Sequence, residues 1–93
     1  DMKTFAKLTL QHIQAACDPS TSVEDAIEKL ESAQRCFGQI EPYVDKTDIM
    51  ITQIPRQITF VIESFKTGGH DRIRQNRGFL TNLVIPELKS LAK

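Results

Sequence analysis

The chain has 93 residues, of which 12 are basic and 12 acidic, so its formal net charge is zero. This balance argues against a nucleic-acid-binding protein, whose overall charge is usually positive. No run of about 18 apolar residues is present, so we expect no transmembrane segment. Apolar residues make up 40% of the sequence, which predicts one small folded domain over residues 1–93.

The first half of the chain predicts two amphipathic helices. One covers residues 2 to about 17, where apolar residues recur with helical spacing, and Pro19 follows its end. The second begins after Thr21 or Ser22, because each has an acidic residue three positions later in a capping-box pattern. We expect Gly38 to end this second helix.

The stretch from Ile54 to Phe65 is the most apolar in the chain. Its apolar residues form one helical stripe, and Phe60, Val61 and Ile62 do not alternate as a half-buried strand requires. Gly68 and Gly69 follow it, so we predict a helix that ends there.

Two less regular segments flank this central helix. Residues 40–47 form a short helix or a turn, and Asp48 can cap a helix that Pro55 then kinks or restarts. After the glycines, Asp71 can cap a last helix that runs to about Leu91, with a kink or break near Val84–Ile85 caused by Pro86. The predicted fold is all-α, a small bundle of about four helices with a Pro-kinked central segment.

The central segment is apolar on more than one face, so other groups must surround it. Three alternatives fit: the chain's own core, a dimer interface, or a cavity for an apolar ligand. We predict a ligand- or partner-binding surface made of Ile51, Ile54, Ile58, Val61, Ile62 and Phe65.

A local basic cluster precedes and opens the last helix. Cations near a helix N-terminus oppose the helix dipole, so their presence needs a reason. They are either a solvated surface or a contact for an anionic group on a partner, a phospholipid or a glycosaminoglycan. The predicted basic contact surface consists of Lys66, Arg72, Arg74 and Arg77.

Cys17 and Cys36 are the only cysteines. A straight second helix would separate them by about 20 Å, whereas the loop before it reaches at most about 13–17 Å. Since a disulfide needs Cα atoms within about 7 Å, an internal bridge requires an extended loop or a shortened helix. We therefore expect a disulfide either across a homodimer or within a strained monomer; two free thiols are the alternative. The even cysteine count and a first residue that is not Met favour a secreted, extracellular protein.

No cluster of residues matches a catalytic, metal or cofactor motif. His12, His70 and the cysteines are suitable zinc ligands, but their spacings fit no known zinc pattern. We therefore expect no enzyme activity, metal or cofactor. In general architecture such a chain is similar to the secretoglobins, small secreted helical proteins that dimerise through cysteines around an apolar cavity. Secretoglobin cysteines, however, lie near the chain ends.

Two functional hypotheses follow. The first is a secreted, non-enzymatic protein that binds an apolar small molecule or a protein partner through its central segment. The second is a small helical signalling ligand, which a receptor recognises through the basic surface at residues 66–77. An intracellular interaction domain with both thiols reduced is the third alternative.

Overall fold

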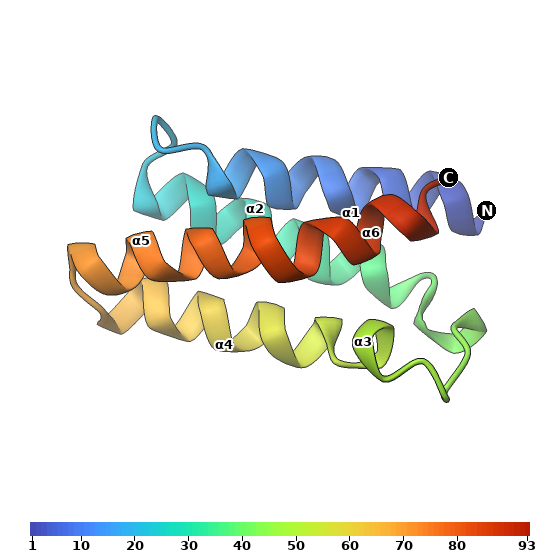
Figure 1. Cartoon of the computed structure of the whole chain (residues 1–93). Helices are drawn as coiled ribbons and strands as arrows, with labels where there is room; N and C mark the ends of the chain where they lie inside the picture. The colour runs from blue at the N-terminus through green and yellow to red at the C-terminus, as the bar shows by residue number, and fades with distance from the viewer.

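Helices α1 (Met2–Cys17) and α2 (Val23–Gly38) form an antiparallel hairpin in the computed structural model, which describes all 93 residues. Helix α4 (Ile54–Thr67) packs against α2, and the chain returns through α5 (His70–Phe79) and α6 (Ile85–Leu91). These helices run up and down and form an all-α bundle without strands (Figure 1). The predicted all-α helical bundle is confirmed.

The first hairpin is fixed by side-chain caps. The carboxylate of Asp1 accepts a hydrogen bond from the backbone N–H of Thr4 at 3.0 Å. Ser22 is the cap of α2, because its hydroxyl oxygen accepts from the N–H of Asp25 at 3.1 Å. Gly38 is the last residue of α2, as predicted, but it does not form a left-handed cap. No glycine has a positive φ, and the chain continues with helical geometry into Gln39, so this glycine provides no left-handed turn.

A short irregular connection links α2 to α4. It contains a 3₁₀ turn, η1 (Glu41–Tyr43), and a single helical turn, α3 (Ile49–Thr52). Asp48 caps α3 as predicted, since its carboxylate accepts from the N–H of Ile51 at 3.2 Å. Pro55 is the second residue of α4, where its missing N–H costs no intrahelical bond. The sequence predicts either a kink or a new helix at Pro55. The structure has the new helix, which begins at Ile54.

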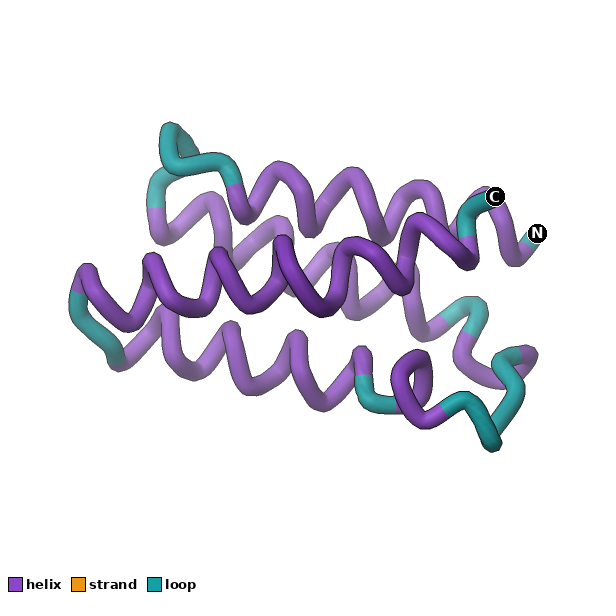
Figure 2. The backbone as a smooth tube through the Cα atoms, viewed as in Figure 1, coloured by secondary structure: helices purple, strands orange, loops and turns teal.

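The last helical rod runs without a loop from His70 to Leu91 (Figure 2). A π-helical segment, η2 (Leu80–Val84), joins α5 to α6 directly before Pro86. Because proline cannot donate a backbone hydrogen bond and its ring clashes with the preceding turn, wider π-type pairing accommodates it. The predicted interruption therefore takes the form of a change in hydrogen bonding. The predicted cap at Asp71 is wrong: Gly69 is the N-cap, and Asp71 lies inside the first turn.

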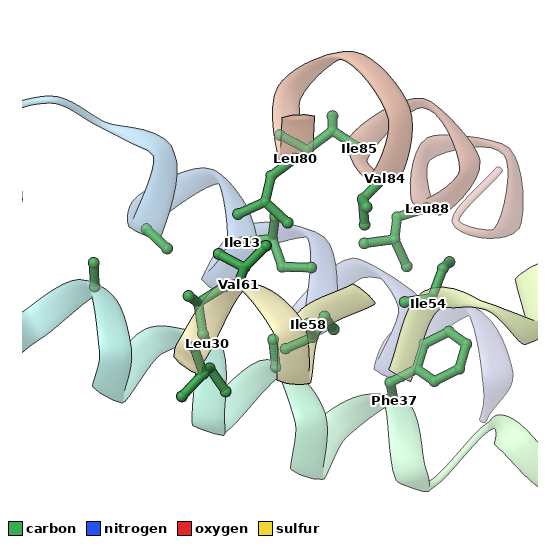
Figure 3. Close-up of a cluster of buried hydrophobic side chains, with 14 of the residues drawn as sticks. Ile13, Leu30, Phe37, Ile54, Ile58, Val61, Leu80, Val84, Ile85 and Leu88 are labelled. Carbon is green, nitrogen blue, oxygen red and sulfur yellow. The ribbon is translucent and has the colours of Figure 1, made fainter. Parts of the chain in front are cut away.

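The stripe on α4 faces the other helices of the same chain. Figure 3 shows how side chains from α1, α2, α4 and the last rod meet around it. None of the residues predicted to bind a ligand or partner is more than 5% exposed: Ile51, Ile54, Ile58, Val61, Ile62 and Phe65. They lie in the core of the chain itself.

Substitutions at two nearby positions on α4, one buried and one exposed, test this orientation of the helix. Ile58→Ala should lower the free energy of unfolding by about 2–5 kcal/mol, because it removes apolar contacts and leaves a cavity in a closely packed core. Phe60→Ala removes a larger side chain that is 61% exposed, so it should change stability by less than about 0.5 kcal/mol. Urea unfolding measures both values. An equal cost at the two positions would contradict this orientation of α4.

Candidate functional site

The two ends of the bundle carry different chemistry. The α1–α2 loop and the α4–α5 turn lie at one end, whereas the connection through η1 and α3 lies at the other, with both chain termini (Figure 1). A concave region lies at each end. We call them the end cleft, beside η1, and the basic groove, beside the α1–α2 loop.

The end cleft has a volume of about 520 Å³. It lies where the first turn of α1 meets the exit from α2, and it is lined by Asp1, Met2, Phe5, Gln39 and Tyr43. Phe5 is half-buried against the core, while the Tyr43 ring is 76% exposed. The Asp1 carboxylate already caps α1. The cleft thus combines two aromatic rings and a thioether with a few polar groups.

Further exposed apolar side chains lie in α3, at the same end of the bundle. Ile49 is 68% exposed, and its neighbour Met50 is also exposed. A single helical turn offers only one face to the core, and Ile51 occupies that face. No motif in the sequence marks Phe5, Gln39 or Tyr43 as a site. The only tyrosine of the chain, next to Pro42 in an irregular connection, was the available signal.

The basic groove has a volume of about 490 Å³ and lies between the α1–α2 loop and the first turns of α5. Its lining residues are Cys17, Pro19, Thr21, Ser22, Val23, His70, Ile73, Arg74 and Arg77. Only Arg74 and Arg77 of the predicted basic surface line it. Lys66 and Arg72 are exposed outside the groove, so the structure divides the predicted surface into two groups.

Arg77 is the most constrained of these cations. Its Nε donates to the carbonyl oxygen of Ala16 at 3.2 Å, and its Nη2 donates to that of Thr21 at 2.8 Å. The guanidinium carbon also lies 5.7 Å from the ring centroid of Phe65, within the range of a cation–π interaction. Arg77 therefore joins the α1–α2 loop to α4 and α5.

Both cysteines are free and half-buried. Cys17 ends α1, with its sulfur 3.7 Å from the carbonyl oxygen of Arg77, whereas Cys36 lies near the far end of α2. The expected internal disulfide is wrong, because α2 is neither shortened nor paralleled by an extended loop. Burial raises the pKa of the Cys17 thiol, and a hydrogen bond with Thr81 and the charge of Arg77 only partly oppose this shift.

The histidines lie on different helices. Partial burial lowers the pKa of His12, and the nearby charges of Lys29 and Arg35 lower it further, so the neutral imidazole is favoured. His70 lines the basic groove. No group of three or more His, Cys, Asp or Glu side chains is placed to hold a metal ion.

Comparison with protein-family models, with curated proteins and with solved structures finds no match. None of the helices is long and apolar enough to cross a membrane. The functional interpretation therefore depends on the two concave regions.

The role of Arg77 as a structural anchor can be tested by substitution. Arg77→Met keeps the aliphatic stem and removes the donors to Ala16 and Thr21, so unfolding free energy should fall by about 1–3 kcal/mol. Arg74→Met is the matched control on the same helix; it breaks only an exposed pair with Asp71 and should cost less than about 1 kcal/mol. Chemical denaturation gives both values. Equal losses would show that Arg77 is not an anchor.

The state of the thiols can be tested on protein that was never exposed to a reductant. After denaturation no chain should contain a bridge between its own Cys17 and Cys36, because the two are not bonded in the fold. In the native fold Cys17 should react more slowly than it does after denaturation, since burial disfavours its thiolate. A monomer lighter by two hydrogens would contradict the fold. A dimer that only a reductant separates would support the predicted covalent homodimer.

Proposed function

We propose that this protein is a non-enzymatic binding module that takes a small apolar ligand in the end cleft. The supporting observation is an open cleft of about 520 Å³ between Met2, Phe5 and Tyr43. Small-molecule sites commonly occupy about 300–1,000 Å³ and are lined mainly by apolar and aromatic side chains with a few polar groups. The end cleft has this composition.

We place the ligand at the end of the bundle, whereas the sequence predicted a binding surface on the central helix. A ligand beside Ile58 or Val61 would have to displace side chains that pack against three other helices. Protein cores are packed as densely as organic crystals, so such an opening would cost a large part of the folding free energy. The end cleft is already open to solvent, so a ligand enters it without separating helices.

The lining also suggests the shape of the ligand. Met2 and Phe5 offer apolar contact on the side of α1, and methionine adapts to irregular ligand surfaces. Gln39 and the Tyr43 hydroxyl offer hydrogen bonds on the side of η1. We propose an apolar, uncharged molecule with one polar end, whose polar end lies beside Gln39 and Tyr43.

We also propose that the protein acts outside the cell, as the cysteine count suggested. Oxidising compartments allow thiols to pair between chains, and the fold leaves both cysteines unpaired within the chain. Secretion stays a prediction, and so does dimerisation. In the alkylation experiment, a dimer that only a reductant separates would support both, whereas two alkylatable thiols on every chain of a monomer would favour the intracellular alternative.

Binding of Nile red, an uncharged apolar dye, tests the end cleft. The dye should bind with a rise in fluorescence, and Tyr43→Asp should weaken the affinity at least tenfold by placing a charge at the cleft. Phe60→Asp is the matched control, because Phe60 is also an exposed aromatic residue but lies on α4, outside the cleft. Circular dichroism checks that both variants fold. Equal affinities of Tyr43→Asp and the unsubstituted protein would overturn the proposal.

A further inference from the structure

We infer that the basic groove binds an oxyanion, namely a phosphate or sulfate group carried by a small molecule. The inference is independent of the end cleft, which lies at the other end of the bundle. It rests on the lining of the groove, which contains His70, Arg74 and Arg77 and no acidic side chain. In a chain of zero net charge, this is a local concentration of positive charge in a concave surface.

Arg77 supplies a fixed set of donors in this groove. A guanidinium group has five N–H donors, and the two bonds to Ala16 and Thr21 leave three of them for another acceptor. Because those two bonds and the Phe65 ring hold the Arg77 side chain in place, ligand binding would cost little additional side-chain entropy. Preorganised donors of this kind favour binding of a charged oxygen.

Arg74 supplies an exposed donor at the rim. Its only ion pair is with Asp71 at 2.8 Å, and the two side chains are 81% and 86% exposed. Exposed pairs of this kind contribute at most about 1 kcal/mol. Arg74 can therefore leave Asp71 for an oxyanion, and the carboxylate of Asp71 acts as a competitor for the same guanidinium group.

The neighbouring groups are compatible with an anion. Ser22 lines the groove, and its hydroxyl oxygen accepts from Asp25, which leaves its O–H free to donate. The pKa of the Asp18 carboxyl is lowered, mainly by hydrogen bonds from Ser20 and to a smaller extent by the positive charge of Arg77. Its carboxylate accepts from the N–H and hydroxyl of Ser20 at 2.9 and 2.8 Å, and it does not line the groove.

The local electrostatics predict that the ligand stabilises the fold. Residues 66–77 contain Lys66, Arg72, Arg74 and Arg77 against Asp71, which gives a formal charge of +3 with histidine neutral. Only Arg74 and Arg77 of these cations line the groove, where their charges repel each other. An anion bound in the groove reduces this repulsion, and any ligand that binds only the folded state raises its stability.

The test is an NMR titration of the full chain with inorganic phosphate, with sodium chloride at matched ionic strength as the reference. We expect saturable shifts confined to the amides of residues 17–23 and 70–77. Arg74→Gln should weaken phosphate binding about tenfold, since it removes a charged donor. Arg72→Gln removes the same charge from the same helix outside the groove, so it should change the affinity less than about twofold. Asp71→Asn should tighten binding, because it removes the competitor of the ligand.

Several outcomes would overturn the inference. Chloride could reproduce the shifts, the shifts could fail to saturate, or Arg72→Gln could weaken binding as much as Arg74→Gln. Vesicles of phosphatidylcholine with and without phosphatidic acid form a second arm of the experiment. Binding to the acidic vesicles without binding of free phosphate would also overturn it, in favour of a membrane surface. Nile red binding is measured separately, so failure of either site leaves the other result intact.

Discussion

The fold depends on the burial of the α4 stripe. Ile54, Ile58 and Val61 are completely buried, and the residues that enclose them come from α1, α2 and the last helical rod. A helix with so much apolar surface is stable only when other elements surround it. In a chain of 93 residues, this requirement turns the apolar faces of the other helices toward one core. The ends of the bundle are left as the places where concave surface can form.

At each end of the bundle the chain reverses its direction, and the two ends do so through different local structures. At the end that carries the basic groove, Arg77 bonds to the carbonyl oxygens of Ala16 and Thr21, which are close to the C-terminus of α1 and would otherwise lack partners. At the other end, the chain passes through η1 and α3 before α4 begins. These short turns cannot bury all their apolar residues, so Tyr43 and Ile49 remain exposed.

Both proposed sites follow from this division of the molecule. An apolar cleft and a basic groove at opposite ends of a rigid bundle can bind two ligands without competing for space. The two regions share no lining residue. We therefore treat them as independent binding sites.

The sequence by itself determined the helices that have a strong local signal. Helical periodicity and capping residues identified α1, α2 and the central helix, and Asp48 was recognised as a cap because its side chain acts on the next turn of backbone. An error occurred where two local signals competed: Gly69 rather than Asp71 is the N-cap of α5. Only the tertiary structure could show that the Ile54–Phe65 stripe faces the chain's own helices. Apolar periodicity is the same for a core, a dimer interface and a ligand cavity. Likewise, Arg74 and Arg77 have the same charge, but their different surroundings decide which one is free to reach a ligand.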